Sequence, residues 1–456
     1  MSQIQTTSIV EHVQAVPQPV EFRSSLITPS TNLIKLHKGN SELFRNNPLK
    51  TLEVNNQTWS MLDSLLPYDF DLCRRRYARE IDANPRLAML GTGMVPFSVF
   101  LKNSILYIIL FYKFDGGKPP NVGTYNPWFK DYTWKYRWVT DGHGWTTCST
   151  IKGTSGKGDG RNFSLILTCP APIASDGPIT LSVWKSEQHQ KPFLEMENLL
   201  VCNEDNQPFR TVSLAVCTQV SDNQIVRLPE WLEYHQQLGF ELFYLYLDSP
   251  NIDIYHKLLE TFMKRHPGLV VFVPFYFESN RRAQLASMHD CVWRLKGVAD
   301  FVALFDVDEF FQLMDKTSQD LLTFVKRKLP KDGENAAFYT PSISFSTIDD
   351  TVPDGFTLVT DTFTIRMPKP LGSRWYKGIL ITNRINYVEI HKLASGEKWI
   401  DVDYSSELRL NHYRVPHHSQ AWKGELAIED LSFSQQFSNK IKTELRRSNI
   451  FIVDSG

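Results

Sequence analysis

The chain has 456 residues, of which 42% are hydrophobic and 22% are charged. This composition is that of a globular protein, and the length predicts about two or three domains. Its 49 basic and 50 acidic residues give a net charge of -1, which excludes the basic bias of a nucleic-acid-binding protein. No apolar run reaches the roughly 18 residues of a membrane-spanning helix. The best candidate, Ser104–Tyr112, is too short and predicts a buried strand instead.

The amino-terminal region lacks the charged-then-apolar pattern of a secretory signal peptide. From the sequence as printed we therefore expect either a soluble, cytoplasmic protein or part of a longer chain. Residues 1–55 are rich in Ser, Thr, Gln, Asn and Pro, which predicts a mobile tail. The six cysteines show no Cys-x-x-Cys spacing, so no zinc site is expected, although disulfides are permitted.

Residues 56–205 have the sequence pattern of a β domain. Runs of β-branched and aromatic residues alternate with clusters of turn-forming residues, a pattern typical of an antiparallel β-sandwich. The aromatic cluster Tyr125–Trp138 fits the core of such a sandwich, and its flat rings are also suited to stacking on sugars. We therefore predict a β-sandwich domain over 56–205, with carbohydrate binding as an open second role for its aromatic residues.

Residues 210–456 change to alternating strands and helices. Buried strand patterns are followed by helical patterns, two of which stop at Gly239 and Gly268. This alternation predicts a doubly wound α/β sheet. Ligands of such sheets bind at the carboxyl ends of the strands, so a site is expected among the residues that end the predicted strands.

Three carboxylates, Asp306, Asp308 and Glu309, end one of these strands inside an apolar run. Burying them would be costly unless something binds them. Residues two apart in a strand share a face, so Asp306 and Asp308 point to the same rim. Carboxylate oxygens in that arrangement suit Mg²⁺ or Mn²⁺, which in turn bind phosphate oxygens. The sequence therefore predicts a site for a metal and a nucleotide diphosphate.

The Asp-x-Asp triplet alone is weak evidence, because the chain contains a second copy at Asp401 and Asp403. That copy has no long apolar strand before it, and we expect it to form a turn. Haloacid-dehalogenase phosphotransferases also place Asp-x-Asp after a strand. Their pattern requires a small or β-branched residue soon after the second Asp, whereas Glu309 and Phe310 follow here. We therefore favour a metal–diphosphate site over a phosphotransferase.

Four blocks of the sequence resemble the family 92 glycosyltransferases, which include plant β-1,4-galactan synthases and nematode galactosyltransferases. These blocks begin with VCTQVSDNQIVRLPEW, RRAQLASMHDCVW, YKGILITNRINYVEIHKL and LRLNHYR, and together they span about residues 210–420. The region 56–205 is similar, more distantly, to the amino-terminal sandwich of the plant enzymes, a module thought to bind carbohydrate.

The resemblance implies a GT-A fold, which is a Rossmann-like doubly wound glycosyltransferase domain, over residues 210–456. It implies an inverting, metal-dependent transfer of galactose from UDP-galactose to a glycan acceptor, with formation of a β-linkage. The metal would be Mn²⁺ or Mg²⁺. It also implies the Golgi lumen as the compartment, since relatives are typically anchored there.

Carried over by position, the resemblance assigns Asp306 and Asp308 to metal and diphosphate. His391 and His412 are both candidates for a third metal ligand. An acceptor hydroxyl must also lose its proton to a general base, and three aspartates remain open for that role. The residues that would border the nucleotide are Arg227, Asp248, Arg282, Gln284, Asp306 and Lys377, and the base candidates are Asp349, Asp350 and Asp361.

Two departures from the family pattern support an alternative. After the second strand, relatives usually read Tyr-Asp-Asn or Tyr-Asp-His, whereas Leu247 precedes Asp248 here, and Gly378 follows Lys377 where relatives have Ser. With the aromatic cluster Tyr125–Trp138, these changes suggest a glycan-binding protein whose transferase domain is degenerate. The intact Asp-x-Asp triplet at Asp306 favours the enzyme.

Overall fold

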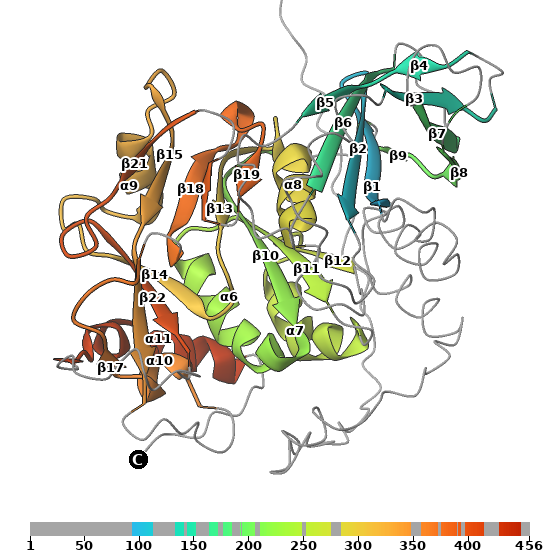
Figure 1. Cartoon of the computed structure of the whole chain (residues 1–456). Helices are drawn as coiled ribbons and strands as arrows, with labels where there is room; N and C mark the ends of the chain where they lie inside the picture. Colours follow the sequence, from blue (N-terminus) through green and yellow to red (C-terminus); the bar gives the residue numbers. More distant parts are fainter. Residues whose placement is uncertain are drawn as a thin grey trace, which may run out of the picture. The chain divides into compact units, whose positions relative to one another are not determined.

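The structure is a computed structural model, shown in Figure 1. It describes residues 94–112, 133–140, 144–151, 164–171, 177–184, 192, 194–205, 210–248, 252–274, 284–347, 357–372, 375–389, 391–393, 397–414 and 428–447. All of them belong to one compact unit, Leu49–Gly456. The predicted tail at 1–55 lies outside them. In the described part of the chain, no helix is long and apolar enough to cross a membrane.

The first described region, 94–205, consists of two mainly antiparallel sheets. The first has the strand order β5-β6-β2-β1-β9 and the second β4-β3-β7-β8. The predicted strand in Ser104–Tyr112 is present as β2 and is buried from Ile108 to Leu110. The strands are β1 (Met94–Lys102), β2 (Ile105–Tyr112), β3 (Thr133–Trp138), β4 (Thr146–Thr147), β5 (Ser149–Ile151), β6 (Ser164–Pro170), β7 (Ile179–Trp184), β8 (Leu194–Leu199) and β9 (Cys202–Asn203).

The aromatic residues of β3 belong to the core of this region. Trp134, Tyr136 and Trp138 are buried, which is the core arrangement that alternation in a strand predicts. Residues 125–132, the rest of the aromatic cluster, lie outside the described residues. The sandwich domain over 56–205 stays a prediction, because much of that range is not described.

The second region is built on a seven-stranded mixed sheet of order β12-β11-β10-β13-β18-β15-β21. Its first four strands are parallel, as the strand–helix alternation predicted. The strands in chain order are β10 (Val212–Ser221), β11 (Leu242–Asp248), β12 (Val270–Pro274), β13 (Ala299–Leu304), β15 (Asn335–Thr340), β18 (Lys377–Ile381) and β21 (Lys398–Asp401).

Helices cover both faces of this sheet, as a doubly wound fold requires (Figure 1). On one face, Leu214 and Val216 of β10 share a core with α6 and α7, and on the other Ala215 packs with α8. Gly239 follows α6 with φ of 105°, a conformation that favours glycine and ends the helix. The helical segments are η3 (Asp222–Arg227), α6 (Leu228–Gln237), α7 (Ile252–Arg265) and α8 (Gln284–Leu295).

A smaller sheet of order β14-β22-β16-β17-β23 adjoins the carboxyl end of β13. Its first strand, β14, follows the turn that contains Asp306 and Asp308, so this turn joins the two sheets. The remaining elements are β14 (Glu309–Leu313), α9 (Leu321–Lys328), β16 (Ser342–Ser346), α10 (Val359–Thr362), β17 (Ile365–Arg366), η5 (Thr382–Arg384), β19 (Val388–Glu389), β20 (Lys392–Leu393), β22 (Leu408–Tyr413), β23 (Ile428–Glu429) and α11 (Ser432–Arg447).

Helix α8 carries a buried polar network that ties the two regions together. Asp290 accepts hydrogen bonds from Ser98 of β1 at 2.5 Å and from Tyr246 of β11 at 2.6 Å. Arg294 pairs with Asp290 at 2.8 Å and also with Glu204. Because these groups are almost completely buried, their mutual pairing is needed to offset the cost of removing them from water.

Two disulfides join described residues of the chain, Cys148–Cys169 and Cys217–Cys291. The second joins β10 to α8 inside the parallel-sheet region. It therefore fixes α8 against β10. Disulfides form and persist in oxidising environments.

Candidate active site

The turn between β13 and β14 presents Asp306 and Asp308 at the carboxyl edge of the sheet, where the sequence predicted a site. Phe305 and Val307 are buried and anchor the turn, while the two carboxylates are 32% and 15% exposed. Glu309 closes the turn, since its carboxylate accepts a hydrogen bond from the Asp306 amide at 2.8 Å. Two neighbouring carboxylates thus face outward while the residues between and beside them fill the core.

Lys377 supplies a positive charge on one side of this turn. It begins β18, which pairs antiparallel with β13, and its Nζ lies 2.8 Å from Asp306 Oδ2 and 3.6 Å from Glu309 Oε2. Burial opposes charge on this lysine, but the Asp306 and Glu309 carboxylates raise its pKa above the usual value. Burial raises the pKa of Glu309 to about 7, against the opposing effect of Lys377. Lys377 is therefore a fixed cation beside Asp306.

His412 lies on the other side of the turn, beside Asp308. Strand β22 pairs with β14 so that His412 is opposite Glu309, and its Nε2 is 3.5 Å from Asp308 Oδ2. Burial opposes protonation of His412, yet the Asp308 carboxylate raises its pKa. Although burial alone would raise the pKa of Asp308, His412, Arg227 and Arg414 hold it well below the usual range. This carboxylate is therefore ionised.

His391, the other candidate ligand, is held differently. Its Nδ1 lies 3.2 Å from the carbonyl oxygen of Tyr376. Burial and the nearby positive charge of Lys377 lower its pKa to about 4, so its ring is neutral near pH 7. The Trp375 ring is near both histidines, with its centroid 6.1 Å from that of His391 and 6.4 Å from that of His412. The sequence reasoning did not single out Trp375, whose only signal was an aromatic pair directly before Lys377.

The structure describes some, but not all, of the residues expected to border the nucleotide. Arg227 ends η3 and donates a hydrogen bond to the Tyr413 carbonyl at 2.7 Å, within electrostatic reach of Asp308. Gln284 begins α8 and lines a narrow cavity that also contains Asp306. Asp248 ends β11, and only its backbone is described. Arg282 lies outside the described residues.

The base candidates are only partly placed. Asp349 and Asp350 lie outside the described residues. Asp361, in α10, accepts hydrogen bonds from Ser434 and Ser438 at 2.6 and 2.7 Å and lies 2.9 Å from the Lys442 ammonium. All three partners belong to α11, so the Asp361 carboxylate binds that helix. Its role as a base stays a prediction.

The second Asp-x-Asp copy forms the expected turn only from Asp403 onward, because its first residue belongs to a strand. Asp401 ends β21, and Asp403 accepts hydrogen bonds from the amides of Ser405 at 2.7 Å and Ser406 at 2.9 Å. Both aspartates are exposed. The Asp403 carboxylate thus satisfies the backbone of its own turn.

The implied metal can be tested against the residues present. Among the described residues, no three His, Cys, Asp or Glu side chains are already gathered as a complete ligand set. Asp308 and His412 nevertheless offer an oxygen and a nitrogen donor side by side, with Asp306 on the same turn. His412 Nδ1 is buried and has no hydrogen-bond partner in that part of the chain. Carboxylate with imidazole is a donor set that suits Mn²⁺, so the residues fit such an ion.

Residues 210–449 match the sequence profile described as Glycosyltransferase family 92. This chain belongs to glycosyltransferase family 92. The matched range is 240 residues long by these bounds, or just over half of the 456, and it contains every candidate site residue. The predicted family is therefore confirmed.

Curated relatives share this half of the chain. A family 92 glycosyltransferase of Ricinus communis is 26% identical over 249 residues, covering 50% of this chain and 38% of the relative. One from Oryza sativa subsp. japonica is 27% identical over 242 residues, covering 51% and 36%. A third, from Arabidopsis thaliana, is 32% identical over 108 residues, covering 24% and 18%. The chain thus matches less than two fifths of the length of each of these relatives.

Solved structures of glycosyltransferases are similar only at a low level. The WbbM bifunctional glycosyltransferase has a TM-score of 0.20 with 14% identity, covering 30% of this chain and 24% of that one. The mannosyltransferase PcManGT from Pyrobaculum calidifontis, in complex with GDP-Man and Mn²⁺, has a TM-score of 0.28 with 12% identity. The match covers 48% of this chain and 64% of that one. At TM-scores this low, neither structure bears on the geometry of the Asp306 turn.

Proposed function

We propose that this family 92 member is an inverting, metal-dependent hexosyltransferase that moves galactose from UDP-galactose onto a glycan acceptor and forms a β-linkage. The observation that carries the proposal is the turn of Asp306 and Asp308 at the carboxyl edge of the sheet, flanked by Lys377 and His412. Such an edge is where ligands of doubly wound sheets bind. The GT-A assignment of residues 210–456 belongs to the same proposal.

The residues of the turn would hold the donor through charge. Asp308 and His412 would bind the metal, with Asp306 beside them, and the metal would supply positive charge to the departing diphosphate. Neutralising one unit charge at ~4 Å is worth about 4 kcal/mol at an effective dielectric near 20. Lys377 keeps a second positive charge at Asp306, which limits the negative charge that the diphosphate meets.

Inversion requires one displacement at the anomeric carbon. The acceptor hydroxyl oxygen forms a bond to the anomeric carbon while the bond between that carbon and the diphosphate oxygen breaks. A base takes the hydroxyl proton. We propose Asp349, Asp350 and Asp361 as the candidates for that base. Of these, Asp361 would have to exchange its bonds to α11 for the acceptor, so the other two are favoured.

The sandwich at 56–205 is proposed as a carbohydrate-binding module. With Trp134 and Trp138 in the core, the rings of Trp145 and Trp184 are partly exposed. Their centroids are 6.0 Å apart, and Arg137 lies 4.6 Å over the Trp145 ring. These paired rings support a sugar-stacking role, and they are also the feature that supports the alternative of a glycan-binding protein with a degenerate transferase domain.

The compartment is proposed to be an oxidising one, such as the Golgi lumen. The disulfides Cys148–Cys169 and Cys217–Cys291 support this proposal, because cytosolic thiols are kept reduced. Mass determination of the protein purified with and without reductant, after alkylation, tests it. Four alkylated thiols appearing only after reduction are expected.

The enzyme and the degenerate domain are separated by donor turnover. UDP-galactose hydrolysis or transfer is measured with Mn²⁺ in the wild type, in Asp308→Ala and in Asp401→Ala as the matched control. The proposal requires activity that is lost in the first variant and kept in the second. Equal activity in Asp308→Ala would refute the metal assignment, and absence of all nucleotide-sugar turnover with weak, metal-independent UDP binding would favour the degenerate domain.

A further inference from the structure

The narrow cavity beside Asp306 lies between the ends of β10 and β11 and the start of α8. Its wall includes Gln219 of β10, Tyr246 of β11 and Gln284, the first residue of α8. Gln219, Gln284 and Asp306 are partly exposed, whereas Tyr246 is 1% exposed. The three partly exposed side chains therefore border the opening of the cavity, and Tyr246 lies at its floor.

Strand β1 of the region 94–205 holds this floor in place. Phe97 packs against Tyr246, with the two ring centroids 6.3 Å apart. The Tyr246 hydroxyl donates to Asp290 Oδ2 at 2.6 Å, and the Ser98 hydroxyl donates to Asp290 Oδ1 at 2.5 Å. The pairing of β1 with β2 shifts register between Pro96 and Ser98, an irregularity that can aim successive side chains at one partner. Two consecutive residues of β1 thus support the same tyrosine, one through its ring and one through Asp290.

The same carboxylate fixes the position of α8. Arg294 donates from Nε to Asp290 at 2.8 Å and from Nη2 to the Ser98 hydroxyl at 3.0 Å, so β1 binds two successive turns of the helix. Asp290 lies less than two helical turns after Gln284. Because a helix moves as a unit over so short a length, the contacts of Asp290 also set where Gln284 stands relative to Asp306.

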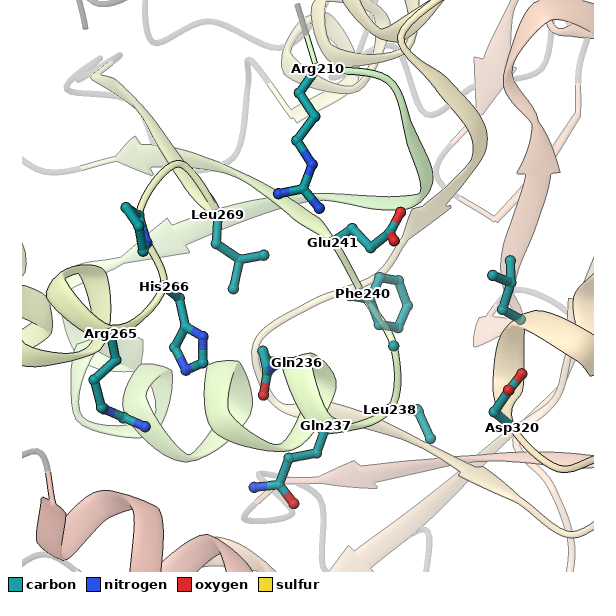
Figure 2. A pocket seen from close by; sticks show the side chains of 13 residues that line it. Arg210, Gln236, Gln237, Leu238, Phe240, Glu241, Arg265, His266, Leu269 and Asp320 are labelled. Atoms are coloured by element: carbon teal, nitrogen blue, oxygen red, sulfur yellow. The ribbon is translucent and has the colours of Figure 1, made fainter. Parts of the chain in front are cut away.

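The opposite, amino edge of the sheet has a larger cavity, of about 590 Å³ (Figure 2). It lies where Arg210, Glu241 and Leu269 precede the parallel strands β10, β11 and β12. Two arginines and two acids line it, so its charge is balanced, and Gln237 points away from it in Figure 2. Tyr246 is near the carboxyl end of β11, so the contacts of Tyr246 support the cavity at Asp306 and not this one.

We propose that β1 is a working part of the donor site, with Asp290 as the positioning residue through which Ser98 holds Tyr246 and α8. Asp290 and Tyr246 are buried and act without touching the donor, by keeping Gln284 opposite Asp306. The inference rests on the proposed function, since the donor is the ligand that this positioning serves. It makes the region 94–205 necessary for donor binding by residues 210–449, in addition to its proposed binding of carbohydrate.

UDP binding in the presence of Mn²⁺ is measured by calorimetry on the full chain. Ser98→Ala removes the β1 hydroxyl from Asp290, and Tyr246→Phe removes the second hydroxyl but keeps the ring. Ser164→Ala is the matched control, because this buried serine of β6 donates to the Leu110 carbonyl at 3.1 Å, a bond of the same region that does not involve Asp290. Thermal unfolding verifies that each variant is folded, and either of the first two tests the inference alone.

We expect about fivefold weaker UDP binding in Ser98→Ala and in Tyr246→Phe, the factor that corresponds to one net hydrogen bond, and no change in Ser164→Ala. Because both hydroxyls act through Asp290, the double variant Ser98→Ala/Tyr246→Phe should lose clearly less than the roughly 25-fold of two independent sites. In steady-state kinetics the KM for the donor should rise while kcat stays unchanged, because the positioning serves the bound donor and the transition state equally.

Three results would overturn the positioning role and leave the proposed function standing. They are equal UDP affinity in Ser98→Ala and Ser164→Ala, losses that multiply in the double variant, and a lower kcat with an unchanged KM. A wild-type chain that binds no UDP with Mn²⁺ instead refutes the proposed function, and the positioning role with it.

Discussion

The chain contains the same triplet, Asp-Val-Asp, in two regions that surround its carboxylates with different groups. At Asp306 and Asp308 the carboxylates face a buried lysine and a buried histidine, with Glu309 under the turn. At Asp401 and Asp403 they are exposed, and Asp403 binds the amides of its own turn. The difference teaches that the triplet acquires a chemical role from what opposes it across the sheet.

The buried lysine should account for the largest effect. Lys377→Met leaves Asp306 and Glu309 without their cation, and breaking a buried ion pair costs about 3–5 kcal/mol. Urea unfolding measures the loss. Lys398→Met is the control, because its pair with Glu334 is exposed and worth about 0–1 kcal/mol. Equal, small losses in both variants would contradict the distinction between the two regions.

The protonation of Glu309 should make the stability of this region depend on pH. Burial raises the pKa of Glu309 from its usual 4.5 to about 7. At pH values between these two, the native state therefore holds a proton on Glu309 that the unfolded state has lost. Its contribution to the free energy of unfolding therefore falls as pH rises from about 4.5 to about 7, by roughly 3 kcal/mol. Glu309→Gln keeps an acceptor for the Asp306 amide and should remove this decline.

The measurement is urea unfolding of the metal-free protein at pH 5 and at pH 7.5. Glu230→Gln is a useful comparison, since burial raises the pKa of Glu230 to about 7 as well, far from the turn in sequence. A wild-type and a Glu309→Gln protein that change in parallel with pH would show that Glu309 does not titrate in this window.

The two histidines should differ in their effect on the metal. His412 is 3.5 Å from Asp308, whereas His391 is bound to the Tyr376 carbonyl and lies near the Lys377 charge. We expect His412→Ala to weaken Mn²⁺ about tenfold, or ~1.4 kcal/mol, and more than it weakens Mg²⁺, because imidazole favours Mn²⁺. Calorimetry with each ion measures this. The reverse ranking, with His391→Ala the weaker binder, would assign the third ligand to His391.

The smallest effect is expected at the second triplet. Asp403→Ala removes a carboxylate that accepts hydrogen bonds from the Ser405 and Ser406 amides. Such bonds contribute about 1 kcal/mol net to the free energy of unfolding. Mn²⁺ affinity should not change. A lower Mn²⁺ affinity in this variant would mean that the two triplets are not functionally distinct.

Much of the family 92 region, residues 210–449, could be predicted from the sequence, because its signals are local. Apolar runs marked β10, β11 and β13, helical spacing marked α6 to α8, and glycines marked where two helices stop. The position of Asp306 at a strand end follows from the same local pattern. The family resemblance was confirmed over residues 210–449.

What could not be predicted depends on contacts between residues far apart in the chain. Lys377 contacts Asp306, 71 positions away in the sequence, because β18 pairs antiparallel with β13. No periodicity in either segment predicts that pairing. The disulfide Cys217–Cys291 was one of many pairings that six cysteines allow. The cavity at the amino edge is assembled from four separate segments, so no single stretch of sequence indicates it.

The central claim is that Asp306 and Asp308 hold a metal and a diphosphate as one linked unit. Calorimetric titration of UDP with and without Mn²⁺, in the wild type and in Asp308→Asn, tests it most directly. The account predicts that Mn²⁺ strengthens UDP binding by about 1–3 kcal/mol in the wild type, and that UDP strengthens Mn²⁺ binding by the same factor. The coupling should shrink in Asp308→Asn. UDP affinity that is independent of Mn²⁺, or coupling that survives undiminished in the variant, would contradict the account.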